Sequence, residues 1–315
     1  MRRPMTDASP PRALLIAAFA VIYIVWGSTY LAIRVAIETL PPFLMAGTRF
    51  LIAGAIMYAW ASSRGAVRPT RAEWRAALIL GAFFLLFGNG GVVWAEQRVP
   101  SGLAAVLVAL LPIWTAIIEW VRPGGRRPTA MVTLGLLIGF GGVALLFAPS
   151  AGSTRVDPVG GIVLMMASLS WGIASVLSKG MPQPESGARA SGMQMLAGGT
   201  LLTLAGLVTG EPGAVNLDAV TLRSAAALLY LIVFGSLLGF SAFTWLLRVA
   251  SPGRVATYAY VNPVVAVFLG WLLLSEPLGL RDLAAAAIIV SGVVLITTAR
   301  ARSGTSSRLS SEAEA

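Results

Sequence analysis

The stretch Thr257-Tyr258-Ala259-Tyr260-Val261-Asn262-Pro263 lies in the middle of an apolar run from about Gly253 to Leu274. A proline inside a helix cannot donate a hydrogen bond to the carbonyl four residues back, so Pro263 predicts a kink or a local opening. Tyr258 and Asn262 are four residues apart and therefore share one helix face. Polar side chains are costly in lipid, so we expect this face to turn toward protein or a water-filled cavity. The stretch predicts a membrane helix whose centre carries either a solute site or a hydrogen bond to a neighbouring helix.

The composition is that of a membrane protein. Hydrophobic residues make up 57% of the 315 residues and charged residues 11%, with a mean hydropathy of +0.82; soluble domains have about 25% charged residues. The net charge of +10 does not indicate nucleic-acid binding, because the arginines are spread over short loops and form no stripe. The chain has no cysteine and no histidine, which excludes disulfides, thiolate and Ser-His catalysis, and the usual zinc ligands.

Ten hydrophobic segments are each close to the roughly 20 residues that a bilayer-spanning helix needs. They lie near residues 13–35, 43–61, 75–93, 102–121, 130–147, 159–177, 190–208, 225–247, 253–274 and 283–299. The first segment follows Met1-Arg2-Arg3, but it is longer than the apolar core of a signal peptide, about 7–15 residues, so we expect it to remain as a helix. The pattern predicts an all-α integral membrane protein with ten transmembrane helices.

The basic residues predict the orientation in the membrane. With the N-terminus inside, the loops on the cytoplasmic side contain most of the Lys and Arg residues, and the opposite loops contain only Arg98, Arg155, Arg223 and Arg281. Because cytoplasmic loops carry an excess of Lys and Arg, both termini are predicted to be cytoplasmic. Residues 1–12 are predicted to form a cytoplasmic N-terminal segment, and the Ser-rich residues 300–315 a disordered cytoplasmic tail.

The two halves of the chain repeat each other. Trp26-Gly27 recurs 145 residues later as Trp171-Gly172. A second set, shifted by 150 or 151 residues, pairs Gly88, Trp94, Gly102, Pro112, Trp120 and Gly142 with Gly239, Trp245, Gly253, Pro263, Trp271 and Gly292. So many Trp, Gly and Pro positions in one register indicate an internal repeat. Each half, 13–148 and 159–299, has five segments, an odd number, so the second enters the membrane from the opposite side. In such inverted repeats solutes bind near the bilayer midplane between the halves.

Several short motifs, in the order in which they occur, carry a resemblance to a known family. They are Trp26-Gly27-Ser28-Thr29-Tyr30, Ala46-Gly47-Thr48-Arg49-Phe50, Gly88-Asn89-Gly90, Val99-Pro100-Ser101-Gly102 and the residues from Ser251 to Gly270. Over nearly the whole chain they resemble the EamA-type permeases of the drug/metabolite transporter superfamily, and within them the YedA group of bacterial inner-membrane permeases. The resemblance implies two EamA domains around a central cavity, in the bacterial inner membrane. It also implies export of small metabolites, amino-acid-like solutes or drugs.

The chain departs from that family pattern at two places. The second half has Ser275-Glu276-Pro277-Leu278 at the end of its fourth segment, whereas the first half has Pro123-Gly124-Gly125-Arg126-Arg127. Position 194, commonly acidic in relatives, is Gln194, and the first segment contains no acid of the kind that the related small multidrug exporters use. Neither position 194 nor the first segment therefore offers a carboxylate that would couple transport to protons or cations.

Arg49 and Gln194 are predicted to reach a solute site from matched positions of the two halves. Arg49 lies about six residues into the second segment, roughly 9 Å along the helix axis, and Gln194 follows it by 145 residues. An intramembrane guanidinium is a candidate anion site because it can bind a carboxylate through two hydrogen bonds. The alternative is that the Arg49 side chain extends to the membrane interface.

Further candidates for solute binding lie at similar depths. They are Trp26, Ser28, Tyr30, Asn89, Trp171, Tyr258 and Asn262. The tryptophans occupy matched positions and would stack on organic solutes. Asn89 lies between two glycines, which allow close approach. For the polar residues, hydrogen bonds that only hold helices together are the alternative.

Three further features concern flexibility and packing. Pro112 and Pro263 occupy matching midspan positions and are predicted to be hinges. Gly135-xxx-Gly139, followed by Gly141-Gly142, predicts a close contact between helices. Glu96, at the outer end of the third segment, either marks the mouth of a cavity or belongs to the surface.

These features together predict a secondary transporter that moves a small organic solute by alternating access, with no cofactor, metal or nucleic acid. A membrane enzyme is disfavoured, because every Asp lies outside the segments and the only lysine, Lys179, does not share a helix face with its neighbour Ser178. No Walker loop is present, so ATP is not expected to drive transport. A passive, channel-like facilitator is the alternative, because no coupling acid is evident. Besides the solute and the lipid bilayer no partner is required, because one chain supplies both halves.

Overall fold

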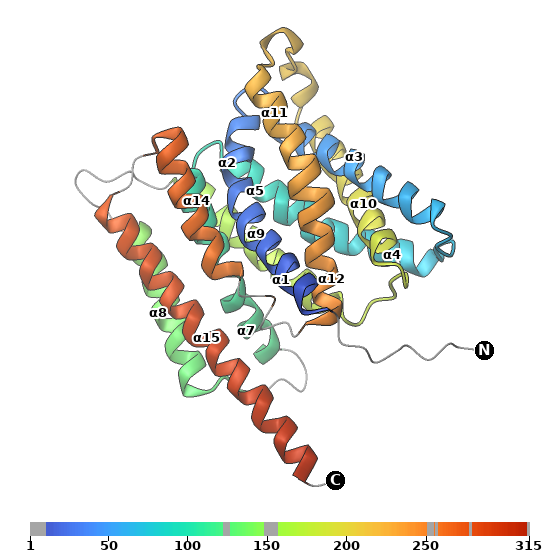
Figure 1. Cartoon of the computed structure of the whole chain (residues 1–315). Coiled ribbons are helices and arrows are strands. Elements are labelled where there is room, and N and C mark those ends of the chain that lie inside the picture. The colour runs from blue at the N-terminus through green and yellow to red at the C-terminus, as the bar shows by residue number, and fades with distance from the viewer. Residues whose placement is uncertain are drawn as a thin grey trace.

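The computed structural model describes residues 11–121, 127–147, 157–250, 255, 258–276 and 279–313, and all regular secondary structure in these ranges is helical (Figure 1). Within these ranges eight helices are long and apolar enough to cross a bilayer, and two shorter apolar helices, Ala130–Leu145 and Val261–Leu274, coincide with the fifth and ninth predicted segments. An all-α multi-pass membrane protein is therefore confirmed, and the number of ten spans stays a prediction. The N-terminal residues 1–10 and the motif at 123–126 lie outside the described ranges.

The helices follow the two halves of the sequence. The first half contains α1 (Arg12–Ala20), α2 (Trp26–Ala36), α3 (Pro42–Ser63), α4 (Arg71–Gly81), α5 (Gly90–Ala95), α6 (Ser101–Val108), α7 (Leu111–Val121) and α8 (Ala130–Phe147). The second half contains α9 (Pro158–Leu177), α10 (Gly187–Val208), α11 (Leu222–Tyr230), α12 (Ser241–Val249), α14 (Tyr258–Leu274) and α15 (Leu280–Ala313). Three wider π-helical segments, Val21–Val25, Ala82–Asn89 and Leu231–Phe240, join α1 to α2, α4 to α5 and α11 to α12.

Local sequence signals account for several helix starts. Thr70 and Glu73 form a reciprocal capping box at α4, and Asp157, Ser186 and Thr221 accept from the backbone N–H three residues on at α9, α10 and α11. Such side chains satisfy the free donors of the first helical turn.

The C-terminal helix is longer than predicted. The sequence predicts that the last span ends near Ala299 and that a disordered tail follows, whereas α15 continues to Ala313. Once a helix is formed, each further residue adds a hydrogen bond at little extra cost, so the apolar span can propagate into the Ser-rich segment.

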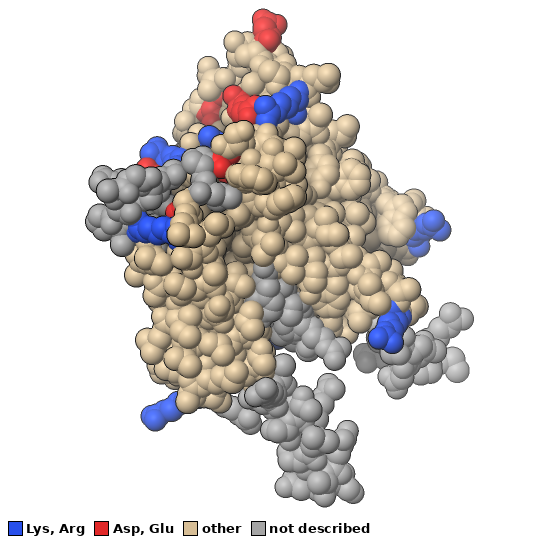
Figure 2. Space-filling view, turned by 60° about the vertical axis from the view of Figure 1, so that its left-hand side comes forward, with Lys and Arg blue, Asp and Glu red and all other residues tan. Residues whose placement is uncertain are grey.

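The exterior suits a lipid environment. On the face drawn in Figure 2 the charged side chains lie around the periphery, and a broad surface between them carries none. Large apolar side chains are exposed on several helices, including Leu137 of α8 and Phe268 and Trp271 of α14. A continuous apolar surface of this kind is stable only in contact with lipid chains or other apolar groups.

Two pairs of glycines place α3 directly against α10. A Cβ atom at Gly54 would lie 3.0 Å from the carbonyl oxygen of Gly192, and a Cβ at Gly47 would lie 3.2 Å from that of Gly199. The 145-residue shift relates Gly47 to Gly192 and Gly54 to Gly199, so the two contacts are equivalent under the repeat. The matched helices of the two halves therefore cross with opposite chain directions, through small residues that let their backbones approach.

The same relation holds between α8 and α15, which lie side by side (Figure 1). A Cβ atom at Gly292 would lie 2.6 Å from the carbonyl oxygen of Gly135, and one at Gly142 would lie 3.0 Å from that of Ala285. The 150-residue shift pairs Gly142 with Gly292 and Gly135 with Ala285. The predicted glycine-rich face of α8 is thus a helix contact, except at Gly141, where a Cβ atom would meet nothing within 4 Å.

The two predicted hinge prolines lie in different local structures. Before Pro112 the helix is broken: α6 ends at Val108, and Ala109 and Leu110 form a turn before α7. Pro263 instead lies inside the continuous helix α14. Both prolines lack the N–H that would bind the carbonyl four residues back, but only at Pro112 does the chain leave the helical path. Their role as hinges stays a prediction.

Candidate functional site

A cavity lies between the two halves and encloses about 680 Å³ of empty space, counting the part that is open to solvent. It is lined by residues of α2, α3, α5, α6, α7, α9 and α14 and of the π-helical segments Ala82–Asn89 and Leu231–Phe240. Seven of the predicted solute-binding residues line it: Trp26, Tyr30, Arg49, Asn89, Trp171, Tyr258 and Asn262. Residues far apart in the sequence therefore meet in one cavity, as expected for a site between two repeats.

The π-helical segments widen the helices beside the cavity. Gly88 and Asn89 belong to Ala82–Asn89, and Gly235 and Phe240 belong to Leu231–Phe240. These two segments correspond to each other under the 151-residue shift. A π-helical turn costs backbone regularity and is found most often at functional sites. Here it brings polar and small residues to the wall of the cavity.

Aromatic rings form one side of the cavity. The rings of Trp26 and Trp171 meet edge to face at 5.6 Å, and those of Trp26 and Tyr258 at 5.4 Å. Each tryptophan lies over a glycine of the other half: a Cβ atom at Gly88 would be 3.0 Å from Trp171, and one at Gly239 would be 2.5 Å from Trp26. The Trp and Gly positions that reveal the repeat in the sequence thus contact one another across the halves.

Arg49 is the only charged residue among the described residues that line the cavity. Its side chain is 3% exposed, and Nε donates to Ser236 Oγ at 2.7 Å. The guanidinium lies 4.6 Å from the centre of the Phe50 ring and close to Gly235, where a side chain would collide with it. Among the described residues its Nη1 has no hydrogen-bond partner, and no carboxylate lies within ion-pair distance of it. A buried cation without a counter-ion is costly, and an anionic ligand would offset that cost.

The two asparagines of the cavity differ in their partners. In the orientation that its surroundings require, the amide nitrogen of Asn262 donates to the carbonyl oxygens of Tyr23 at 3.0 Å and Ile22 at 3.1 Å. Both carbonyls belong to the π-helical segment Val21–Val25. Asn89 Oδ1, in contrast, is buried and has no partner among the described residues. Asn262 therefore stabilises the contact between α14 and the segment Val21–Val25, while Asn89 keeps an unpaired acceptor at the cavity.

This difference predicts opposite effects of the same substitution. Asn262→Leu is expected to lower the free energy of unfolding by about 1–3 kcal/mol, because two buried carbonyls lose their donor. Asn89→Leu is expected to leave stability unchanged or to raise it, because it removes an unpaired buried oxygen. Thermal unfolding of the two purified variants measures the effects. Equal losses of stability in the two variants would contradict the conclusion that Asn262 has a structural hydrogen bond and Asn89 does not.

Two predicted residues lie outside the cavity. Ser28 is bonded to Val25 O at 2.7 Å and to the Tyr230 hydroxyl at 2.6 Å, so it joins α2 to α11. Gln194 faces the loop before its own helix, and its Nε2 approaches Gln183 Oε1 at 3.4 Å. The 145-residue shift pairs Gln194 with Arg49 in the sequence. It does not give the direction of the side chain, which the packing of α10 against α3 and α4 sets.

Other lining residues were not predicted from the sequence. They include Thr29, Phe50, Gly235 and Phe240, together with several aliphatic residues. Phe240 was detectable, because it follows Asn89 by 151 residues and is its counterpart in the repeat. For Thr29 and Phe50 the sequence carries no comparable signal, because apolar and hydroxyl side chains in a membrane helix are common on every face.

The architecture is that of a helical membrane protein with a cavity between two related halves, and comparisons with known proteins agree. The model of the EamA-like transporter family matches residues 13–148 and 158–298, so the chain belongs to that family. The chain is 39% identical over 285 residues to the uncharacterised inner membrane transporter YedA of Escherichia coli (strain K12), covering 90% of each chain. It is 27% identical over 299 residues to the uncharacterised transporter YvbV of Bacillus subtilis (strain 168), covering 93% of this chain and 94% of the other.

A third relative and a solved structure extend the comparison. Protein PecM of Dickeya dadantii (strain 3937) is 28% identical over 283 residues, covering 86% of this chain and 88% of PecM. One crystal structure superposes with a TM-score of 0.64 at 21% identity, covering 93% of this chain and 99% of the other. At that identity the likeness shows the fold alone. The family and the relatives described as transporters place the chain among membrane transporters.

Proposed function

We propose that the chain is a secondary transporter of the bacterial inner membrane that exports small organic solutes, of the kind of metabolites, amino-acid-like compounds or drugs, by alternating access. The observation that carries the proposal is the guanidinium of Arg49, which has no counter-ion among the described residues, in a cavity between the two halves. The location supports transport, because carriers built from inverted repeats bind their solutes where the repeats meet. The direction of export rests on the resemblance to the family.

The chemistry of the cavity favours a solute with a carboxylate and an apolar or aromatic body. Arg49 would bind the carboxylate with Nη1, the group that has no hydrogen-bond partner among the described residues. Trp26, Trp171 and Tyr258 would pack against the apolar body. Asn89 Oδ1 would accept a hydrogen bond from an amino or hydroxyl group, as in an amino acid. The proposed solute is therefore acidic or zwitterionic.

The orientation follows from the basic residues of the loops. With both termini in the cytoplasm, the loops that contain Arg98 and Arg223 face the outside. Those loops lie at the end of the bundle where α2 and α5 end and where α3, α6 and α11 begin.

A ligand screen followed by a counterflow assay tests the proposal. The purified protein would first be screened for thermal stabilisation by amino acids, aromatic carboxylates and cationic drugs. A ligand present at a hundred times its dissociation constant is expected to raise the free energy of unfolding by about 2.7 kcal/mol. The stabilising solute would then be loaded into proteoliposomes, and uptake of the labelled solute measured. If the protein is a carrier, labelled solute is expected to accumulate transiently inside the proteoliposomes, because it enters in exchange for the unlabelled solute that leaves. Linear, non-saturating equilibration would instead favour a channel-like facilitator.

A further inference from the structure

The two halves are joined at one end of the bundle by a set of hydrogen bonds. Glu276, just beyond α14, accepts from the backbone N–H of Ser101 at 2.8 Å and of Gly102 at 3.2 Å, at the start of α6. Glu211, beyond α10, accepts from the N–H groups of Phe43 at 3.0 Å and Leu44 at 2.8 Å, at the start of α3. A carboxylate is favourable at a helix N-terminus because it satisfies free donors and offsets the helix dipole. Here each one belongs to the second half and caps a helix of the first.

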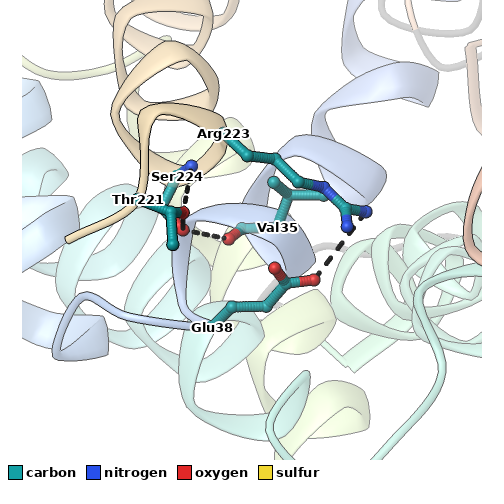
Figure 3. Close-up of polar contacts among 5 residues, drawn as sticks. All are labelled: Val35, Glu38, Thr221, Arg223 and Ser224. Carbon is teal, nitrogen blue, oxygen red and sulfur yellow. Dashed lines mark hydrogen bonds and ion pairs between the residues drawn. The ribbon is translucent and has the colours of Figure 1, made fainter. Parts of the chain in front are cut away.

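Figure 3 shows a further contact between the halves at this end. Ser224 of α11 donates to the carbonyl oxygen of Val35 in α2 at 3.0 Å, and Arg223 lies 3.8 Å from the Glu38 carboxylate. To open a path from the cavity to this end, the halves must separate and these contacts must break.

The carboxyl of Glu96 lies buried at the same end. Glu96 follows α5 directly and is 0% exposed, and in the part of the chain that the structure describes neither of its carboxyl oxygens has a hydrogen-bond partner. The guanidinium of Arg34 in α2 donates to the backbone carbonyl of Glu96 and not to its carboxylate. An ionised carboxylate would be expected to take the donor that is already beside it, so this arrangement fits a neutral, protonated carboxyl.

The charged groups around Glu96 have opposite effects on the ionisation of its carboxyl. Arg34 attracts a negative charge on Glu96, and Glu276 repels it. The ion pair of Arg98 and Asp157, at 4.0 Å, lies nearby between the end of α5 and the start of α9. α6 and α9, as well as Ala82–Asn89, contain no titratable side chain, and α3 contributes only Arg49 and Tyr58. Burial raises the pKa of the Glu96 carboxyl and Glu276 raises it further, while Arg34 lowers it.

Glu96 is also connected to the cavity. Val92 lines the cavity and lies one helical turn before Glu96. Tyr30 lines the cavity as well and interacts electrostatically with Glu96. A change of charge at Glu96 would therefore act on both the closed end and the cavity wall.

We propose that the Glu96 carboxyl is a proton-binding site of the transport cycle, which holds a proton while this end of the bundle is closed and releases it to water when the end opens. The inference rests on the proposed function for its role in transport, and its test does not need the solute. On opening, the O–H bond of the carboxyl breaks, the proton passes to water, and the carboxylate that remains is hydrated. Its charge then repels Glu276 and favours separation of the halves.

The sign of the pH dependence follows from this arrangement. The closed state has the raised pKa and the open, hydrated state has a value nearer the ordinary one of a glutamate. The closed state is therefore most favoured at low pH, and it loses that advantage as the pH rises through the raised pKa. Alkaline conditions are expected to open this end.

Cysteine labelling tests the proposal, because the chain has no cysteine of its own. Val99, three residues after Glu96, is 1% exposed and contacts Gly160 of the second half. The labelling rate of Val99→Cys by a membrane-impermeant maleimide would be measured from low to high pH in lipid nanodiscs, with and without Glu96→Gln. Relative to the Glu96→Gln background, the rate with Glu96 intact is expected to rise with pH, by up to about tenfold for each unit by which the pKa differs between the closed and open states.

Two controls complete the experiment. Val67→Cys, at a site 83% exposed in the loop before α4, reports the pH dependence of the thiol reaction itself. Glu276→Gln with Glu96 intact is expected to shift the midpoint of the labelling profile to lower pH, because it removes the charge that repels an ionised Glu96. If Glu96→Gln does not fold, Glu276→Gln is the variant with which the wild-type profile is compared.

Three results would overturn the proposal. The first is a pH profile of Val99→Cys labelling that is the same with Glu96 intact as in the Glu96→Gln background. The second is a midpoint that does not fall in Glu276→Gln, and the third is a response to sodium at constant pH in place of a response to protons. Failure of the protein to transport any solute would instead overturn the proposed function and leave the labelling result intact.

Discussion

Arg49→Ala is expected to weaken the binding of a carboxylate-bearing solute by roughly 10- to 100-fold, because hydrogen bonds to a charged group contribute about 1.5–3 kcal/mol. The guanidinium donates to Ser236 through Nε, and its Nη1 has no hydrogen-bond partner among the described residues. Arg49→Lys keeps the charge and loses the second hydrogen bond, so its affinity is expected to lie between those of the wild type and Arg49→Ala. Thermal shift or calorimetric titration with the solute found in the screen measures the dissociation constants.

Three comparisons separate an anion site from a structural role. Arg189→Ala is the matched control, because Arg189 is also buried but bonds Ser62 and the Ala66 carbonyl away from the cavity. It is expected to lower stability and leave the dissociation constant unchanged. The methyl ester of the solute is expected to bind wild type and Arg49→Ala equally. Arg49→Met is expected to raise the unfolding temperature of the solute-free protein, because it removes a buried unpaired charge. If Arg49→Ala binds the free acid as the wild type does, Arg49 is not the anion site.

Gly135→Ala is expected to destabilise the protein by about 1–3 kcal/mol, the usual cost of adding atoms to a closely packed interior. The new Cβ atom would lie 2.7 Å from the carbonyl oxygen of Gly292, which belongs to the backbone of α15 and can move only with its helix. The measurement is the unfolding temperature of the purified protein.

Gly141→Ala in the same helix is the control. The substitution is chemically identical, and a Cβ atom there would meet nothing within 4 Å. Alanine favours a helix over glycine by about 1 kcal/mol, so Gly141→Ala is expected to be neutral or stabilising. A result in which both variants lose the same stability would show that helix propensity, and not the contact of α8 with α15, decides the effect.

The internal repeat explains which residues of the candidate site could be predicted from the sequence. Trp26 and Trp171 are visible as a matched pair, and each contacts the glycine, Gly239 or Gly88, that the second set of matches supplies. Rare residue types at fixed spacing therefore identified positions that meet across the halves. The same reasoning misplaced Ser28 and Gln194, whose side chains turn to Tyr230 and Gln183.

Glu96 shows the opposite case. In the sequence it is one acid at the end of a span, with nothing to separate a surface group from a buried one. Its burial arises from residues that are remote in the chain, α2 with Arg34 on one side and the loop with Glu276 on the other. No local pattern encodes those neighbours.

Hydropathy, the positions of Arg and the repeated Trp, Gly and Pro residues indicated the membrane class, the two-repeat organisation and seven of the residues that line the cavity. They could do so because lipid requires long apolar helices and because a repeat places equivalent residues at equivalent depths. The tertiary structure alone decided which side chains face the cavity, that Arg49 has no counter-ion among the described residues, and that Glu96 is buried. Helical periodicity states which residues share a face, but the direction in which that face turns depends on how remote helices pack against it.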